Sequence, residues 1–484
     1  MNETVGTLTH RRKMIVLVSC CLSLLIVSMD ATIVNVAIPA IRTDLSASPS
    51  QMQWVLDVYT LVLASLLMLS GATGDRFGRR RVFQIGLTMF ALGSLACSLA
   101  PTIDTLIGAR FLQGIGGSMM NPVALSIISQ IFVKPQERAR ALGIWGGVTG
   151  ISMAAGPIVG GLLIETVGWR SVFWINLPIC AAALILTAVF VPETKSATMR
   201  SVDPIGQLLA VVTLFGVVYT LIEGPVLGWT HPRVLGIALV AAVALAAFLR
   251  YESRRQDPFL DLRFFRSIPF SSATISAVSA FSAWGAFLFM MSLYLQGERG
   301  FSAMHTGLIY LPIAIGALIF SPLSGRLVGR FGARPSLVIA GTMIVAAATM
   351  LTFLTASTPV WWMLIVFAVF GIGFAMVNAP ITNAAVGGMP LDRAGAASAV
   401  TSTSRQVGVS IGVALCGSVA GSAITMGGTD FATAARPLWF VCVALGFVIL
   451  ALGVYSTSQR AHRSAERLAP LIAGTPSPVG AHVR

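Results

Sequence analysis

Three charged residues, Asp30, Asp57 and Arg110, lie inside apolar stretches that are long enough to cross a membrane. A charge in hydrocarbon costs at least ~2.5 kcal/mol on insertion scales, so charges at such positions usually move ions or bind substrate. Burial favours the protonated form of a carboxyl group, whereas a neighbouring cation favours its ionised form. An aspartate that alternately meets Arg110 and loses it can therefore bind and release a proton.

Each of the three residues also has a structural interpretation, which the sequence leaves open. Asp30 could be a structural acid that hydrogen-bonds Thr32 or a neighbouring helix. Asp57 could face the external membrane interface, and Arg110 could be a static tie between two helices.

The composition indicates that a bilayer surrounds these residues. Of the 484 residues, 56% are hydrophobic and only 10% are charged, and the mean hydropathy is +0.84. These values indicate an all-α polytopic membrane protein. Runs of about 20 apolar residues, the length that spans ~30 Å of hydrocarbon, predict fourteen helices. They lie near 14–36, 52–72, 82–100, 105–131, 140–163, 170–191, 204–223, 234–250, 269–295, 305–325, 335–355, 359–384, 396–422 and 437–456.

The distribution of positive charge predicts the orientation. If the chain starts in the cytoplasm, 25 of its 32 Lys and Arg residues fall in cytoplasmic tails and loops, so the positive-inside rule places both termini there. The Lys and Arg residues that set the orientation also account for the net charge of +14. Nucleic acid is not an expected partner, because no basic face carries interleaved aromatic residues. The exceptions are Arg42, Arg170, Arg233, Arg299 and Arg436 outside, and Arg110 and Arg405 within spans.

Helix polarity and length place the three charged residues at one depth. Asp30 follows Lys13 by about 25 Å of helix, which puts it in the outer half of the membrane. A helix that begins outside near Ser50, with Ser50 and Gln53 as a capping box, carries Asp57 about 10 Å below its start. Arg110 lies at a similar depth if its helix begins at 102–105. We expect these helices to bring two acids and one base to one layer.

A repeated loop pattern divides the chain. GATGDRFGRRR at 71–81 recurs as GRLVGRFGARP at 325–335, an offset of 254 residues, with Gly329 in place of Asp75. An offset that spans eight helices predicts a 6+2+6 arrangement with the two halves as parallel repeats. We expect a six-helix bundle at 1–192, a linker with two inserted helices at 193–266, a second six-helix bundle at 267–457 and a disordered tail at 458–484.

Four motifs make the chain similar to the major facilitator superfamily, in its fourteen-helix drug:proton antiporter branch. MDATIVNVAIP at 29–39 resembles the helix 1 signature of the branch, and GATGDRFGRRR at 71–81 resembles the cytoplasmic loop motif of the superfamily. ARFLQGIGGS at 109–118 is similar to the helix 4 motif, and GISMAAGPIVGG at 150–161 to the helix 5 antiporter motif, which is the most specific for export. TSTSRQVGVSIGVAL at 401–415 also resembles helix 13 of the branch.

The resemblance implies the major facilitator fold and a role for each motif. Asp30 would be the helix 1 acid and Arg110 the base that assists proton transfer, with Asp57 added as a third proton-coupling candidate. Gly71, Asp75, Arg76, Gly78 and Arg79 would form a cytoplasmic latch that holds the halves together in the outward-facing state. Gly150, Gly156, Pro157, Gly160 and Gly161 would shape the helix 5 interface associated with export. Multidrug members that favour cationic drugs have further acids in the second half, whereas no acid lies inside the six spans predicted here.

These features predict a proton-driven exporter of hydrophobic drugs or antibiotics that works by alternating access, as a monomer, in the cytoplasmic membrane. Lys occurs only at 13, 134 and 195 against a large excess of Arg, which suggests a GC-rich bacterial genome. Polar and aromatic residues in the spans are candidate substrate contacts, although such aromatics usually serve packing. The candidates are Trp54, Phe111, Gln113, Asn121, Trp145, Trp284, Tyr310 and Asn378.

Other functions remain as alternatives. A proton-coupled uptake carrier for a nutrient or siderophore would share the repeat and the latch, and a receptor or scaffold would not need Asp30. No lysine follows the glycine spacing of a phosphate-binding loop, so ATP is not the expected energy source and no cofactor is expected. An enzyme is not expected either, because the spans contain no cysteine, histidine or paired-carboxylate constellation suited to catalysis or to a metal.

Overall fold

The computed structural model describes residues 9–194, 203–255, 260–386, 394–426, 431–461 and 463–464, and these residues form helices and connecting turns without a strand. Residues 195–202 and 256–259 of the predicted linker at 193–266, and most of the predicted disordered tail at 458–484, lie outside this part of the chain. The first half comprises α1 (His10–Asp44), α2 (Pro49–Phe77), α3 (Arg79–Ser98), α4 (Ile103–Ile131), α5 (Pro135–Thr166), α6 (Ser171–Trp174) and α7 (Asn176–Phe190). The inserted pair is α8 (Pro204–Leu227) and α9 (Pro232–Glu252). A 3₁₀ helix, η2 (Leu262–Arg266), leads into α10 (Ile268–Leu293), a π-helical turn η3 (Tyr294–Glu298), α11 (Ala303–Ile309), α12 (Leu311–Phe331), α13 (Ala333–Leu351), α14 (Val360–Val386), α15 (Ala394–Met426) and α16 (Phe431–Tyr455).

Most of these helices can cross a bilayer. Within the described residues, 11 helices are long and apolar enough, or 12 when α2, bent by 52° after Leu67, is taken as one span. The prediction of fourteen also counts α5 and α15, which are 32 and 33 residues long but are not in that set. Both are rich in Gly, Ala and Ser and pack between other helices, where small residues allow close approach rather than contact with lipid.

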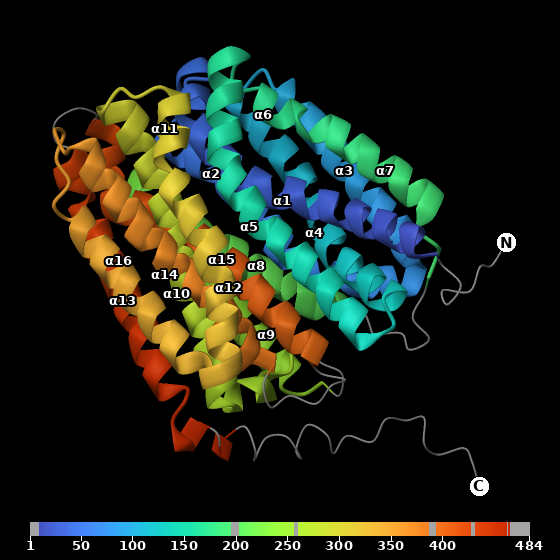
Figure 1. The fold of residues 1–484 in the computed structure, drawn as a ribbon. Helices are drawn as coiled ribbons and strands as arrows, with labels where there is room; N and C mark the ends of the chain where they lie inside the picture. The colour runs from blue at the N-terminus through green and yellow to red at the C-terminus, as the bar shows by residue number, and fades with distance from the viewer. Residues whose placement is uncertain are drawn as a thin grey trace, which may run out of the picture.

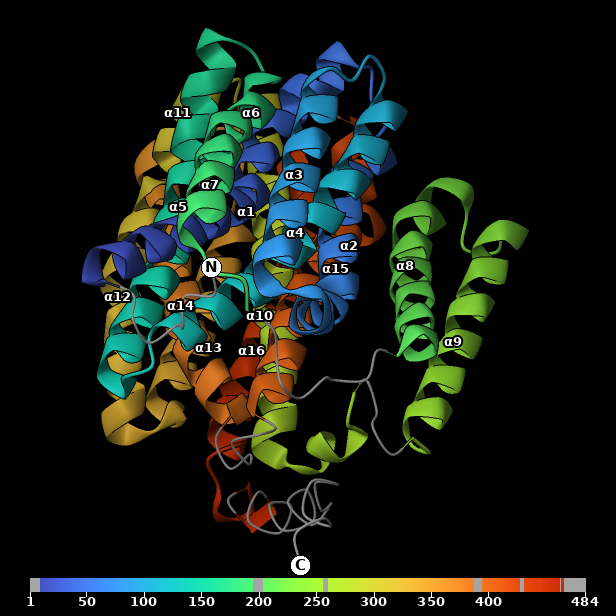
Figure 2. The same ribbon diagram turned by 90° about the vertical axis from the view of Figure 1, so that its right-hand side faces the viewer.

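The helices form two bundles with a separate pair beside them. The blue-to-teal helices of the first half and the yellow-to-red helices of the second half lie next to each other in Figure 1. The inserted helices α8 and α9 pack on one another and stand at the side of the molecule in Figure 2. Helix α8 of this pair packs against the bundles, through α2 of the first half and α15 of the second. The inserted pair therefore borders both halves.

Side-chain caps define where the helices of the site begin. The Ser48 hydroxyl group accepts from the Gln51 amide, and the Gln51 side chain accepts from the Ser48 amide. This capping box starts α2 two residues earlier than the predicted Ser50–Gln53 box, because Pro49 fits the first turn of a helix. Thr102 and Thr105 cap α4 in the same reciprocal way, at the predicted position.

The two halves contact each other near one end of the bundle. The Gln53 amide donates to the Val413 carbonyl oxygen at 2.6 Å, and the Gln296 amide donates to that of Val36 at 3.0 Å. At the same end α11 packs against α5, near the top of Figure 1. At the opposite end, where α1 begins and α12 ends, no hydrogen bond or salt bridge joins the halves within the described ranges. Among the described residues, the halves are thus closed at one end and have no polar contacts between them at the other.

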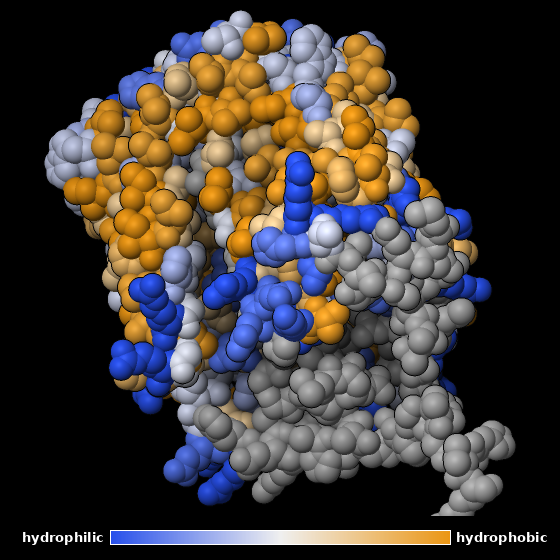
Figure 3. All heavy atoms as spheres, turned by 45° about the vertical axis from the view of Figure 1, so that its right-hand side comes forward, coloured by the Kyte–Doolittle hydropathy of each residue, from blue (hydrophilic) through white to orange (hydrophobic). Residues whose placement is uncertain are grey.

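The surface agrees with a membrane environment. In Figure 3 hydrophobic side chains cover most of the upper part of the visible face, and hydrophilic side chains gather in its lower part. Large apolar residues such as Leu239, Val243 and Phe440 are more than half exposed, which a lipid environment explains because hydrocarbon solvates them.

Candidate functional site

Two of the three predicted charged residues form an ion pair inside the first bundle. Arg110 of α4 donates through Nη1 to Oδ2 of Asp30 on α1. The two side chains are 1% and 0% exposed. A buried charge without a partner is costly, so breaking a buried ion pair costs more free energy than breaking an exposed one. The pair is therefore the central electrostatic contact between α1 and α4.

Polar side chains satisfy the remaining atoms of this pair. Gln113, one turn after Arg110, accepts from Arg110 Nη1 at 2.6 Å and donates to Asp30 Oδ1 at 2.9 Å. The Gln113 amide also donates to Ser94 Oγ of α3 at 2.8 Å. Asn176 of α7 donates to Asp30 Oδ1 at 3.5 Å and to Ser94 Oγ at 3.3 Å. The carboxylate of Asp30 thus accepts from three side chains on two other helices.

A close approach of α3 and α4 holds this network in place. A Cβ atom added to Gly93 would lie 2.6 Å from the Gln113 backbone nitrogen and 2.7 Å from its Cα. Only glycine allows the two backbones to come so close. The backbone of Gln113 is therefore positioned by Gly93, and the amide side chain is directed toward Asp30 and Arg110.

Arg110 also reaches the second helix. Its Nε donates to the Val55 carbonyl oxygen at 3.0 Å, and its guanidinium carbon lies 4.2 Å from the centre of the Tyr59 ring. Such a cation–π contact stabilises a cation when it is desolvated. One arginine side chain consequently links α4 to α1 and α2.

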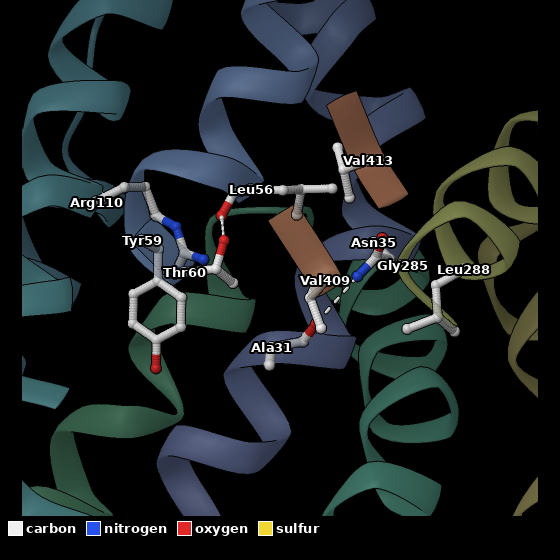
Figure 4. Close-up of a pocket in the computed structure, with 10 residues that line it drawn as sticks. All are labelled: Ala31, Asn35, Leu56, Tyr59, Thr60, Arg110, Gly285, Leu288, Val409 and Val413. Atoms are coloured by element: carbon white, nitrogen blue, oxygen red, sulfur yellow. Dashed lines mark hydrogen bonds between the residues drawn. The ribbon is translucent and has the colours of Figure 1, made fainter. Parts of the chain in front are cut away.

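A small cavity connects this site to the second half. Its volume is about 20 Å³, enough for one water molecule, which needs ~10–15 Å³. Figure 4 shows Arg110 and Tyr59 on one side of it and Gly285 and Leu288 of α10 on the other. Val409 and Val413 of α15 complete the wall, together with Ala31, Asn35, Leu56 and Thr60. The ion pair therefore lies next to the contact between the two halves.

Asp57 lies apart from the ion pair, so the three charged residues do not meet in one site. It is fully buried, and its polar neighbour is Ser410 of α15. Neither carboxylate oxygen has a hydrogen bond within the described part of the chain, and the Ser410 hydroxyl pairs with Thr60 at 2.6 Å. The interpretation of Asp57 as an exposed residue at the membrane interface is wrong, because α15 covers it. Asp57 faces the boundary between the halves instead.

The predicted small-residue helix α5 packs on both halves. A Cβ atom on Gly156 would lie 2.0 Å from Thr32 Oγ1, and one on Gly160 would lie 2.7 Å from Ile33 Cγ1. These two positions fit α5 against the turn of α1 that follows Asp30. Gly150 lies in the same helix.

The other face of this segment of α5 meets the second half. A Cβ on Gly161 would lie 2.5 Å from the Ala303 carbonyl oxygen, and one on Gly307 would lie 2.4 Å from that of Pro157. These positions join α5 to α11. Gly161 and Pro157 therefore lie at the closed end of the molecule.

The predicted latch residues contact their own half. Asp75 forms an ion pair with Arg79 at 2.7 Å, one helical turn away across Gly78. Gly78 has φ = 111°, and a Cβ there would lie 2.5 Å from Glu193 Oε1. Gly71 approaches Pro122, and Arg76 lies over the Phe77 ring. Across the described ranges, no hydrogen bond or salt bridge links these residues to the second half.

The eight predicted substrate contacts do not converge on one site. Gln113 belongs to the ion-pair network, and Trp54 donates to Glu223 of the inserted helix α8 at 2.9 Å. Phe111 is 46% exposed, whereas Trp284 and Tyr310 are buried in aromatic packing. Asn121, Trp145 and Asn378 are half-buried. None of the eight lines the small cavity.

The second half has an aromatic cluster where the first half has the ion pair. The sequence Gly-Ile-Gly at 114–116, followed by Asn121, recurs at 371–373, followed by Asn378. When the two segments are aligned on this pattern, Phe367 and Phe370 correspond to Arg110 and Gln113. Phe287 of α10 contacts both, with ring centroids 4.8 and 4.2 Å apart. In the first half, Asp30 takes the place of Phe287 and contacts Arg110 and Gln113. The charged site therefore exists in only one of the two repeats.

Three members of the site, Ser94, Asn176 and the Val55 carbonyl group, were not predicted from the sequence. A polar residue in an otherwise apolar span was a signal for the first two, but nothing in the sequence shows that a backbone carbonyl accepts from Arg110. No group of three or more His, Cys, Asp or Glu side chains that could hold a metal occurs in the residues that were placed.

Comparisons with known proteins agree with this architecture. The profile of the Major Facilitator Superfamily matches residues 20–413. A solved D-xylose-proton symporter has the same fold, with a TM-score of 0.66 and 14% identity over 92% of this chain and 97% of that one.

Several curated relatives are more similar in sequence. Multidrug resistance protein Stp of Mycobacterium tuberculosis is 38% identical, with 85% of this chain and 76% of that protein covered. The tetracenomycin C resistance and export protein of Streptomyces glaucescens is 37% identical over 83% of this chain and 74% of that protein. The methylenomycin A resistance protein of Streptomyces coelicolor is 35% identical, with 90% of each chain covered. The chain therefore belongs to the Major Facilitator Superfamily and is a multi-pass membrane protein.

Proposed function

We propose that the protein is a proton-coupled antiporter that exports hydrophobic small molecules across the cytoplasmic membrane of a bacterium. Its relatives include bacterial proteins named for multidrug resistance, tetracenomycin C resistance and export, and methylenomycin A resistance. These names support an export function for this chain. It acts as a transporter rather than an enzyme, as a monomer, with a small hydrophobic substrate and protons as its ligands.

The observation that carries the proposal is the buried pair of Asp30 and Arg110. Both side chains are nearly inaccessible, so each depends on the other for charge compensation. Proton uptake by Asp30 removes one charge of the pair and weakens its hold on Arg110. Proton release restores the pair. A carboxyl group whose partner is an arginine on another helix can thus couple its protonation to the relative position of α1 and α4.

Contacts around α1 connect Asp30 to the boundary between the two halves. Thr32 and Ile33 follow Asp30 and pack against Gly156 and Gly160 of α5. The next residue of α5, Gly161, packs against the backbone of α11 in the second half. A shift of α1 relative to α4 therefore reaches the boundary between the halves within about two helical turns.

Asp57 is the second proton-coupling group of the proposal. It lies at the contact between α2 and α15, without a hydrogen bond to either carboxylate oxygen in the placed residues. A neutral carboxyl group tolerates such a site better than a carboxylate does. Separation of α2 from α15 would expose it to water and allow it to exchange its proton, so its protonation favours the closed contact.

The conformation is inward-open under the proposed topology. With both termini in the cytoplasm, the closed end formed by Gln53, Val413 and α11 is external. The latch residues are then cytoplasmic and have contacts only in their own half among the residues described. In the outward-facing state we expect Asp75, Arg76 and Arg79 to join the halves while the Gly161 contact opens.

Proton movement in proteoliposomes tests the proposal. The lumen contains a pH-sensitive dye, and a panel of lipophilic cations, lipophilic acids and antibiotics is tested with wild type, Asp30→Asn and the control Asp104→Asn. Asp104 lies in the first turn of α4, near the same helix end but outside the ion pair. We expect proton flux opposite to substrate in wild type and the control, and none in Asp30→Asn. Flux in the direction of the substrate would make the protein an importer, and no flux with a compound that binds would reject coupled transport.

A further inference from the structure

Arg405 is a second arginine within a span, and it has no acidic partner among the described residues. It follows the start of α15 by 11 residues, or about 16 Å of helix. No salt bridge involves Arg405 within the described chain. In the sequence of the second bundle the only acidic residues are Glu298, Asp392 and Asp430, and none of them lies inside a predicted span. The second bundle thus supplies no internal carboxylate that could neutralise Arg405.

The guanidinium group has donors left for a ligand. Its Nη2 donates to Thr382 Oγ1 of α14 at 2.6 Å, and its Nε has no acceptor among the described residues although it is shielded from solvent. The side chain as a whole is partly exposed, as is that of Thr382. An arginine has five N–H donors in a fixed fork that matches a carboxylate. Arg405 and Arg110 therefore differ, because Asp30, Gln113 and Val55 already satisfy Arg110.

The surroundings of Arg405 increase its attraction for an anion. Its guanidinium carbon lies 5.9 Å from the Phe281 ring. Phe281 packs on Phe374 at 5.1 Å, and Trp284 stacks on Phe374 at 4.3 Å. This aromatic group lowers the local polarity, and charge pairs are stronger where water is scarce.

Close packing between α10 and α15 fixes the arginine. A Cβ on Gly408 would lie 2.7 Å from the Val278 carbonyl oxygen, and one on Gly412 would lie 2.1 Å from that of Ser282. These glycines begin one turn after Arg405. The backbone that carries Arg405 is therefore held against α10, which reduces the entropy lost when a ligand binds.

We propose that Arg405, with Thr382 beside it, binds the carboxylate of a hydrophobic organic acid, so that the exported substrates include anionic amphiphiles. This inference rests on the proposed export function and adds a substrate class to it. The first half lacks this site, because there Asp30 neutralises Arg110. It is also opposite in charge to a site for cationic drugs.

Binding of matched probes tests this inference. Radiolabelled 2-naphthoate, its methyl ester and 2-naphthylmethylammonium share one ring system and differ in charge. Equilibrium dialysis with the purified protein measures their affinities. We expect 2-naphthoate to bind about tenfold or more tightly than the other two probes, because a hydrogen-bonded charge contributes that much. Arg405→Gln should remove this preference, Arg405→Lys should retain part of it, and the exposed control Arg326→Gln should leave it unchanged.

Three outcomes would overturn the inference. They are equal binding of all three probes to wild type, a preference for the cation, and an Arg405→Gln variant that keeps the wild-type preference. Melting temperatures of the variants check that each is folded, and the charge-retaining Arg405→Lys variant separates loss of charge from loss of packing. Proton-coupled transport of the neutral ester and of 2-naphthoate is measured in proteoliposomes in parallel. Absence of coupled transport of both the ester and 2-naphthoate rejects the proposed export function, whereas ester transport without a preference for the acid rejects only the role of Arg405.

Discussion

The carboxylate of Asp30 and the guanidinium group of Arg110 are 80 residues apart in sequence and form a buried ion pair between α1 and α4. Because Arg110 also donates to the Val55 carbonyl oxygen, the same side chain holds α2. Gln113 donates to Asp30 and to Ser94 of α3. A single proton on Asp30 therefore changes the contacts of four helices.

We expect Asp30→Asn to abolish proton-coupled transport and to lower the melting temperature in detergent. The substitution leaves Arg110 buried without a counter-charge, and breaking a buried pair costs about 3–5 kcal/mol. The double variant Asp30→Asn/Arg110→Gln removes both charges and should recover much of the melting temperature without transport. If the double variant is less stable than Asp30→Asn, the unpaired charge is not the cause of the loss.

Gly93→Ala should destabilise the first bundle. The new methyl group would lie 2.6 Å from the Gln113 backbone nitrogen, so α3 and α4 must separate and the amide that contacts Asp30 must move. The control is Gly108→Ala in α4, where a Cβ meets nothing within 4 Å. Thermal unfolding should show a loss for Gly93→Ala and little change for Gly108→Ala. Equal effects would mean that helix propensity, and not the close approach, determines the result.

Gly161→Ala should open the closed end. Its Cβ would lie 2.5 Å from the Ala303 carbonyl oxygen, which weakens the contact of α5 with α11. In a variant without native cysteines, a single cysteine at Val36 reports on this end through its rate of reaction with a maleimide. We expect faster labelling in Gly161→Ala. Gly147→Ala in the same helix, whose Cβ has no neighbour within 4 Å, should label as the parent does.

Gly78→Ala and Gly332→Ala test the latch as a matched pair. These glycines occupy equivalent loops and have φ values of 111° and 77°, so alanine is strained at both, by about 1–3 kcal/mol. Only at Gly78 would the new atom approach Glu193, at 2.5 Å, whereas nothing lies within 4 Å at Gly332. Transport should therefore fall further in Gly78→Ala. Equal losses would assign the effect to backbone strain alone.

The inserted helix α8 should stabilise the first half through Trp54. Its indole Nε1 donates to Glu223 Oε1 at 2.9 Å. Trp54→Phe and Glu223→Leu should each lower the melting temperature, and the double variant should lose little more than one single variant, because both remove the same bond. Additive losses in this double-mutant cycle would show that the two side chains act independently.

Several features of the site could be predicted from the sequence. The depth of Asp30 and Arg110 follows from the rise of a helix and from the positions of the loops, and their opposite charges indicate a pair. The loop repeat predicts two related halves, and the glycines at 156, 160 and 161 predict close helix packing. Each of these inferences depends on the spacing or recurrence of residues along the chain, which the sequence contains directly.

Other features depend on how each helix is rotated about its own axis. Depth alone could not tell that Asp57 faces Ser410 of α15 while Asp30 faces Arg110, because both acids lie at a comparable level of the bundle. That rotation is set by packing between distant segments, such as Gly93 against the backbone of Gln113 and Gly156 against Thr32.

The sequence by itself determined that the chain crosses a membrane many times and that its spans contain two acids and two arginines. Apolar length and charge are properties of each segment, and they persist whatever the neighbouring segments do. Only the tertiary structure decided that Arg110 has an acidic partner. Among the described residues, it also decided that Asp57 has no hydrogen bond and that Arg405 has only a hydroxyl group as its acceptor. Pairing is a property of two surfaces, and the close packing of the helices selects which side chains meet.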